Sequence, residues 1–205
     1  MKRLLLALTS LLLGACFGYA KQENIVLHTQ FQTIDEITLC TGTDDGMCIK
    51  TVDKVKELLP LELQKIIVDS TQFIEVYTGD RQDFLRRMTT EEIHITEFEY
   101  EGVTGFGYDD LTVLYSMADV YTLIHELAHA YEYSFWYDGT YDNPSSSAEW
   151  QDAYETEYIS SYGTTNVMEF YAECFSMYFR YPQGLKMFCP KAYALLDQDL
   201  GEMEW

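Results

Sequence analysis

The stretch His125-Glu126-Leu127-Ala128-His129 carries the most informative pattern in this chain of 205 residues. Apolar, helix-compatible residues flank it and indicate a helix over residues 117–133. Residues four apart lie on one face of a helix, so His125 and His129 project side by side and can ligate one metal ion. Glu126 lies beside them, close enough to take a proton from a water on that ion. An alternative interpretation is a pair of core histidines that share a helix face.

This spacing is the H-E-x-x-H arrangement of zinc metallopeptidases. Zinc lowers the pKa of its bound water toward about 7, and the glutamate acts as general base and then as general acid. A catalytic zinc site uses three protein ligands and keeps one position open. We therefore expect one Zn²⁺ per chain, with His125 and His129 as two ligands, Glu126 as the catalytic base, and a third ligand elsewhere in the sequence.

The third ligand is expected to be a carboxylate. Phe135 occupies the position at which a longer metalloprotease motif has its third histidine, and His28 and His94 lie well upstream. The downstream carboxylates are Glu132, Glu149, Asp152, Glu155, Glu157, Glu169 and Glu173.

Glu169 and Glu173 differ from the other carboxylates because they lie four apart in a very apolar segment, residues 167–179. Burial of an unpaired charge is costly, so these two carboxylates need partners, and a metal with its histidines can provide them. One carboxylate can ligate the metal while the other accepts the free ring N–H of a ligating histidine. The alternative interpretation is two solvated glutamates on an amphipathic helix.

A longer segment around these glutamates resembles a known family. It reads Tyr162-Gly163-Thr164-Thr165-Asn166-Val167-Met168-Glu169-Phe170-Tyr171-Ala172-Glu173-Cys174-Phe175. This is similar to the third-ligand segment of the anthrax lethal factor catalytic-domain family of zinc metallopeptidases, which includes small secreted Pro-Pro endopeptidases. The resemblance covers residues 111–196. It implies that Glu169 is the zinc ligand, that Tyr162 donates to the oxyanion, and that Glu173 is an outer carboxylate.

The match to the family has some departures, none of them at a proposed ligand. Ala128 stands where the family often has glycine, and Tyr171 and Cys174 replace a phenylalanine and an alanine. The chain has no room for the large targeting domains of lethal factor, so delivery like that of a toxin does not carry over. Only the small members of the family imply cleavage next to proline.

The order of the expected elements predicts an α+β fold. Strands alternate with helices first, and helices follow alone. With the resemblance, this implies a zincin-like (gluzincin) architecture: a small sheet-bearing N-terminal lobe, a helical C-terminal lobe and the zinc site between them. We expect residues 102–107 to be a mobile lip or an ordinary turn, and residues 111–115 to be an edge strand or an internal strand. The other expected elements are strands at 25–27, 37–39, 73–77 and 93–100, a turn at 41–46, and helices at 51–68 (divided by Pro60), 80–88, 146–158 and 166–180. A capping box that runs from Ser146 to Glu149 is expected to open the helix at 146–158, and Asn166 can cap the helix that follows it.

The N-terminus has the pattern of an export signal. Lys2 and Arg3 precede an apolar stretch at residues 4–13, which is too short to anchor stably in a bilayer. Two processing sites compete: a bacterial lipobox at Leu13-Gly14-Ala15-Cys16, with Cys16 as the lipidation site, and cleavage after Ala20. We favour the lipobox. Residues 1–20 are assigned as the signal segment, which contains both possible processing sites. Residues 21–205 are expected to form a single metallopeptidase domain, and the protein is expected to lie outside a bacterial cell or at its surface.

Both processing sites leave four cysteines for disulfides: Cys40, Cys48, Cys174 and Cys189. An even number of cysteines outside the cytoplasm suggests disulfide bonds, with three connectivities open. Loop length favours the local pairs, Cys40 with Cys48 and Cys174 with Cys189. The alternative is four buried thiols in a reducing compartment.

The charge balance excludes some partners. The chain has 13 basic and 34 acidic residues, a formal net charge of −21, which repels phosphate backbones and anionic lipid. We therefore expect a monomer that acts on a peptide or protein substrate, binds no nucleic acid, and contacts membrane only through a lipid at Cys16. The main alternative is an inactive binding lipoprotein on the same fold, against which the intact Glu126 argues. An aminopeptidase would need an amine-binding acidic motif, and a zinc-storage lipoprotein would need histidine-rich tracts. We find neither in the sequence.

Overall fold

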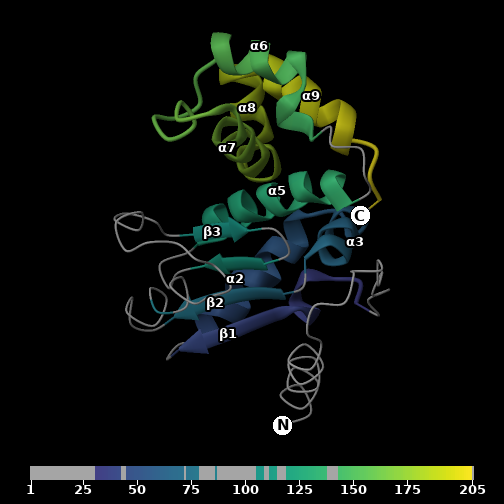
Figure 1. Ribbon diagram of the computed structural model, residues 1–205, viewed down its shortest axis with the longest axis vertical. Coiled ribbons are helices and arrows are strands. Elements are labelled where there is room, and N and C mark those ends of the chain that lie inside the picture. Colours follow the sequence, from purple (N-terminus) through teal and green to yellow (C-terminus); the bar gives the residue numbers. More distant parts are fainter. Residues whose placement is uncertain are drawn as a thin grey trace, which may run out of the picture.

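The structure is a computed structural model that describes residues 31–42, 45–71, 73–78, 86, 105–108, 111–114, 119–137 and 143–204 (Figure 1). The expected signal segment with Cys16, the expected strands at residues 25–27 and 93–100, and the expected helix at residues 80–88 apart from Arg86 lie outside the described residues.

The described residues form a mixed, mostly helical fold, and the α+β class predicted from the sequence is confirmed at this level. Strands and helices alternate in the N-terminal half, and only helices follow. The elements are η1 (Ile34–Glu36), β1 (Thr38–Gly42), α2 (Asp45–Leu58), α3 (Leu61–Ser70), β2 (Phe73–Thr78), β3 (Gly105–Tyr108), β4 (Leu111–Leu114), α5 (Val120–Tyr137), η3 (Pro144–Ser146), α6 (Ala148–Thr156), α7 (Val167–Arg180), α8 (Pro182–Phe188) and α9 (Pro190–Leu200).

The described strands form one four-stranded sheet in the order β1-β2-β4-β3. β1 pairs in parallel with β2, and β2 pairs in parallel with β4, while β3 runs antiparallel to β4. Of the two alternatives for residues 111–115, the internal strand is therefore right. The loop expected at residues 102–107 is wrong over its C-terminal part, because Gly105 pairs with Leu114 and Gly107 pairs with Thr112. Ladder hydrogen bonds to β4 outweigh the low strand propensity of these glycines.

The helical segment around Pro60 divides as the sequence predicts. Cys48, Val52 and Val55 are buried at helical spacing, so one face of α2 packs into the core. Pro60 has no backbone N–H to continue α2, and it stands immediately before the first residue of α3. The turn expected at residues 41–46 is shorter than predicted, since β1 extends to Gly42 and α2 begins at Asp45.

Helix α5 lies at the centre of the molecule. It packs against α7 in the helical part and against α2, α3, β3 and β4 in the sheet-bearing part, and Figure 1 shows it between these two layers. Leu123, Ile124, Leu127 and Ala128 are all fully buried, as expected for a helix covered on several sides. Within the described ranges, no helix combines the length and the apolar character needed to cross a membrane.

The C-terminal helices begin where local chemistry favours a start. The Asn166 side chain caps α7 by accepting a hydrogen bond from the backbone N–H of Glu169 at 3.0 Å, as predicted. α6 is capped by Ser147, which accepts from the backbone N–H of Trp150, one residue later than the capping box in the sequence suggests. Trp150 is buried and packs edge-on against Tyr171, with ring centroids 4.7 Å apart. The caps set where the two helices begin, and the aromatic contact holds α6 against α7.

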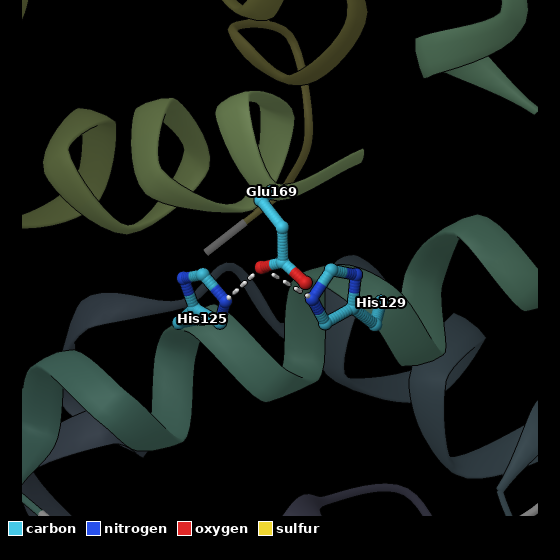
Figure 2. Close-up of side chains that lie close together, drawn as sticks. All are labelled: His125, His129 and Glu169. Atoms are coloured by element: carbon cyan, nitrogen blue, oxygen red, sulfur yellow. Dashed lines mark hydrogen bonds and ion pairs between the residues drawn. The ribbon is translucent and has the colours of Figure 1, made fainter. Parts of the chain in front are cut away.

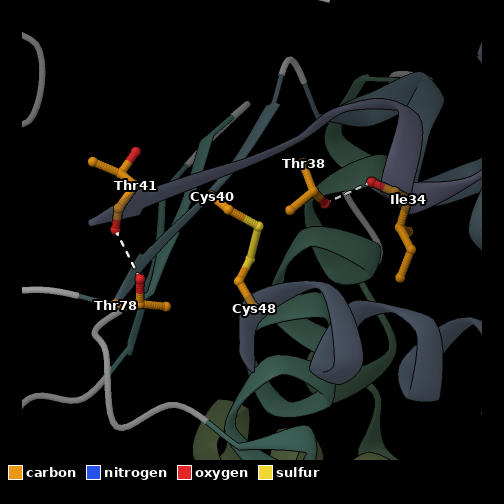
Figure 3. Close-up of a disulfide and its surroundings, with 6 residues drawn as sticks. All are labelled: Ile34, Thr38, Cys40, Thr41, Cys48 and Thr78. Atoms are coloured by element: carbon orange, nitrogen blue, oxygen red, sulfur yellow. Dashed lines mark hydrogen bonds between the residues drawn. A yellow bond between two sulfur atoms is a disulfide. The ribbon is translucent and has the colours of Figure 1, made fainter. Parts of the chain in front are cut away.

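Of the two predicted disulfides, one is present. Cys40 of β1 is bonded to Cys48 of α2, which confirms the first pair (Figure 3). The prediction of a bond between Cys174 and Cys189 is wrong, because both residues are buried free thiols. They interact by a hydrogen bond, and the Cys189 thiol also donates to the backbone carbonyl of Tyr158 at 3.5 Å. Loop length measures only the chain entropy of closing a bond, whereas burial lets these thiols pack as small apolar groups.

We expect that replacing Cys40 and Cys48 together by serine lowers the free energy of unfolding by about 2–3 kcal/mol. The bond closes a short loop, with a sequence separation of 8, and constrains the unfolded chain accordingly. Urea unfolding of the two proteins measures the difference. A reductant should destabilise the wild type by the same amount and leave the double variant unchanged. Equal stability of oxidised wild type and variant would contradict the assignment.

Candidate metal centre

Two histidines on α5 form one side of the site. His125 is 5% exposed and His129 is partly buried, and their rings meet edge-on with centroids 5.0 Å apart. This arrangement follows from their spacing, since residues four apart stand one above the other on a helix. The alternative of two core histidines packed by chance is less satisfactory, because both rings face polar groups from another helix, α7.

Glu169 on α7 supplies the third group. Its carboxylate points between the two imidazoles (Figure 2), with Oε2 lying 3.0 Å from Nε2 of His125 and 3.5 Å from Nε2 of His129. The Asn166 cap sets this position, because it fixes the first turn of α7 on which Glu169 lies. One ligand atom from each of the three residues lies within 4.8 Å of the others. The group could therefore hold a metal ion.

The donor set fits a divalent transition metal. Ligand bonds of about 2.1 Å at tetrahedral angles place ligand atoms about 3.4 Å apart, close to the 3.0 and 3.5 Å separations found here. Nδ1 of His125 is buried and has no hydrogen bond of good geometry among the described residues. It faces Oε1 of Glu173 at 3.3 Å. A ligating histidine usually directs its second ring nitrogen at such a carboxylate, so the surroundings of His125 also suit a ligand.

The charges of these groups are strongly coupled. Burial alone would raise the pKa of Glu169, but hydrogen bonds and charge interactions with His125 and His129 outweigh it and lower that pKa to about 2. Burial lowers the pKa of His125. For His129 burial acts in the same direction, but the hydrogen bond to Glu169 and the charges of three nearby glutamates outweigh it and raise its pKa. Glu169 is thus ionised at neutral pH, as a metal ligand must be.

Glu126 has the opposite electrostatic environment. Its side chain is buried, and burial is the main cause that raises its pKa to about 7. Its charge interacts with His129, Glu169 and Tyr162, so it lies at the same site. A carboxylate whose pKa is near neutrality can both accept and return a proton under physiological conditions, as general acid–base catalysis requires.

Tyr162 lies beside the site on the turn before α7. Its ring centroid is 5.7 Å from that of His125, although the residue is 55% exposed. Burial of part of the side chain, with the Glu169 and Glu126 carboxylates, raises its pKa to about 12, so its hydroxyl remains a donor. Gly163 permits this turn, because a Cβ there would lie only 2.6 Å from Cγ2 of Ile159. The structure therefore places the Tyr162 ring next to His125, at the side of the metal-binding group.

The remaining carboxylates have other partners. Glu132 is almost fully buried and accepts hydrogen bonds from the backbone N–H of Ser145 at 2.9 Å and from Asn143. Asp152 pairs with Lys191, and Glu157 accepts from two backbone N–H groups at the start of α9. None of these three carboxylates belongs to the metal-binding group, in agreement with the sequence analysis, which favoured Glu169 and Glu173.

Tyr121 is a residue of this region that the sequence analysis did not identify. Its hydroxyl donates a hydrogen bond to Oε1 of Glu173, the carboxylate oxygen that faces His125. Tyr121 lies four residues before His125 and so shares its helix face. This spacing was a usable signal, but 17 tyrosines in the chain obscure it.

Comparisons with known proteins do not place the chain in a family. No protein-family model matches it, and no curated protein sequence matches it. The resemblance to the lethal factor family therefore rests on the sequence motifs alone, and the chemistry of the site is argued from its own residues.

We expect the purified protein to take up one equivalent of Zn²⁺ and to lose this uptake on His129→Ala substitution. Loss of a residue that hydrogen-bonds to a metal ligand lowers metal affinity about 10–100-fold, and a ligand itself contributes more. His129→Ala should therefore lower the zinc affinity by more than about 100-fold. Competition with a chromogenic chelator measures it. Glu155→Gln, which removes an exposed carboxylate of α6, is the control and should bind like the wild type. Equal binding by His129→Ala would exclude this centre.

The stability of the metal-free protein should depend on pH through Glu126. The pKa of Glu126 is raised from an ordinary 4.5 to about 7, so the folded state holds its proton more tightly than the unfolded chain. Ionisation between these values costs folded stability. Metal-free Glu126→Gln should therefore gain up to about 3 kcal/mol relative to the wild type as pH rises from about 4 to about 8. Unfolding by urea across this range measures the difference, and parallel stability curves would contradict the assignment.

Proposed function

We propose that this chain is a zinc-dependent endopeptidase. The observation that carries the proposal is the convergence of His125 and His129 from α5 with Glu169 from α7, with Glu126 at the same site. A structural zinc site would use four protein ligands, usually with cysteines among them, whereas two histidines and one glutamate leave a position open. A buried carboxylate that titrates near neutrality beside an open metal position is typical of hydrolytic enzymes.

His125, His129 and Glu169 would hold the metal. Zinc bound there would act as a Lewis acid that lowers the pKa of a coordinated water and polarises the scissile carbonyl. Glu126 would take the proton from the attacking water and then give it to the leaving amine nitrogen. Its pKa of about 7 is suited to both transfers.

Tyr162 would stabilise the charge that develops on the carbonyl oxygen during attack. Its raised pKa keeps the phenol protonated, and its position 5.7 Å from the His125 ring, between centroids, puts it at the edge of the metal-binding group. A donor that is already in place when the charge develops lowers the barrier by a few kcal/mol.

The architecture around the site supports a zincin-like (gluzincin) fold. A sheet-bearing part and a helical part meet at α5, and the proposed third ligand comes from the helical side. β3 is the terminal strand of the described sheet and packs against α5. An extended peptide could add to this strand by backbone hydrogen bonds and so lie across the site. The edge position that the sequence analysis considered for residues 111–115 thus belongs to the neighbouring strand, β3.

We infer further that the protein is related to the anthrax lethal factor catalytic-domain family and works outside a bacterial cell, either free or anchored through Cys16. The Cys40–Cys48 bond supports an oxidising compartment. The expected partner is a peptide or protein substrate, and the expected form is a monomeric single domain of residues 21–205.

The test is cleavage of a mixed peptide library by the zinc-loaded protein, with mass-spectrometric detection. We expect wild-type cleavage to be lost in Glu126→Gln and on treatment with a chelator, while Glu126→Gln still binds zinc. Tyr162→Phe should lower kcat by about 10–1000-fold, since it removes one oxyanion donor. Tyr158→Phe, which alters an exposed tyrosine of the segment before that turn, serves as the matched control.

The outcomes separate the proposal from its main alternative. Cleavage that survives both Glu126→Gln and the chelator would contradict the proposal. Zinc binding by the wild type without cleavage of any library member would instead favour an inactive binding protein on the same fold.

A further inference from the structure

A row of polar side chains on α7 faces α5 next to the metal centre. Groups further along α7 contact residues earlier on α5, which shows that the two helices run antiparallel. Residues three or four apart share a helix face, and the α7 row follows this spacing. Its members are Glu169, Glu173, Ser176 and Arg180.

Three of these four side chains hold Tyr121 of α5. Ser176 donates a hydrogen bond from Oγ to the backbone carbonyl of Tyr121 at 3.1 Å. The guanidinium of Arg180 packs against the Tyr121 ring, 5.1 Å from its centroid. Glu173 accepts the hydrogen bond of the Tyr121 hydroxyl. A backbone atom, the ring and the hydroxyl are thus all engaged, which leaves this side chain little freedom.

Glu173 connects Tyr121 to the metal centre. The oxygen that accepts the Tyr121 hydroxyl, Oε1, is the same oxygen that faces Nδ1 of His125 at 3.3 Å. The Glu173 side chain is only 7% exposed, so little water can replace a lost donor. A buried carboxylate needs such donors to remain charged, and the charged form is the better acceptor for an imidazole N–H.

We infer that Tyr121 is a positioning residue for the metal centre: through Glu173 it orients the His125 imidazole so that Nε2 is presented to the metal. The inference rests on the proposed metal centre and adds to it a residue outside the ligand set. Tyr121 does not contact the metal-binding atoms of Glu169 or His129 in this scheme. The Tyr121 ring also lies 6.2 Å from the His125 ring between centroids, a contact that phenylalanine would keep. The effect of the Tyr121 hydroxyl on the metal should therefore pass through Glu173.

The test measures Zn²⁺ affinity by chelator competition for four proteins: the wild type, Tyr121→Phe, Glu173→Gln and the double variant. Loss of an outer partner of a histidine ligand costs about 10–100-fold, so we expect that range for Glu173→Gln and about tenfold for Tyr121→Phe. Because Tyr121 acts through Glu173, the double variant should bind no more weakly than Glu173→Gln alone.

The matched control is Tyr178→Phe. Its hydroxyl donates to Asp197 at 3.1 Å, so this variant also removes a hydrogen-bonded phenol from the helical part. We expect its zinc affinity to equal that of the wild type. Unchanged affinity in Tyr121→Phe, or a loss that multiplies fully with that of Glu173→Gln, would overturn the inference.

A measurement on the wild type removes any dependence on how the variants fold. In the zinc-loaded protein, ¹⁵N-resolved imidazole spectra should show His125 with Nδ1 protonated and its proton protected from exchange with water. A His125 bound through Nδ1, or an Nδ1 proton that exchanges freely, would overturn the inference while the metal centre itself stands. A wild-type protein that takes up no zinc would overturn the proposed function, and this inference with it.

Discussion

The packing of α7 against α5 is the interaction on which the rest of the site depends. Two helices usually meet through apolar side chains, but here a polar row lies between them and must be satisfied within the interface. On α5 the row consists of Tyr121, His125 and His129, and on α7 of Glu169, Glu173, Ser176 and Arg180. Each of these side chains contacts a partner across the interface. Because the two helices run antiparallel, the two rows stay in contact over several helical turns.

The surrounding structure holds this interface in place. On one side of α5, the sheet and helices α2 and α3 cover its apolar face. At the C-terminal end of α5, Glu132 accepts the backbone N–H of Ser145 and so fastens the short η3 turn that precedes α6. α6 in turn packs Trp150 on Tyr171 of α7. Both helices of the site are therefore fixed from outside, which limits the movement of the groups between them.

Glu169 and Glu126 differ in pKa because their surroundings differ. Glu169 faces both imidazoles, whose hydrogen bonds and charges outweigh its burial and keep its pKa near 2. Burial dominates at Glu126, and its pKa rises to about 7. Pairs of carboxyl groups whose pKa values are pushed apart in this way mark a division between a charged ligand and a proton carrier. This division supports the roles proposed for them.

The sequence by itself determined the helix that carries the two histidines, the Pro60 division, the Asn166 cap and the α+β class, and it favoured the local Cys40–Cys48 bond. These features depend on helical spacing, on capping or on short loops, all of which act between neighbours in the chain. The sequence also singled out Glu169 and Glu173 as charged groups in an apolar segment, but it required a resemblance to rank them.

Only the tertiary structure decided the features that depend on distant segments. It placed β4 inside the sheet and drew Gly105 and Gly107 into β3, because ladder hydrogen bonds come from another strand. It left Cys174 and Cys189 as thiols, since disulfide formation requires a mutual geometry that loop length does not encode. It also joined Tyr121 to Glu173 across 52 residues of sequence. The local sequence pattern indicates which groups need a partner, but only the packing of distant segments determines which partner each group meets.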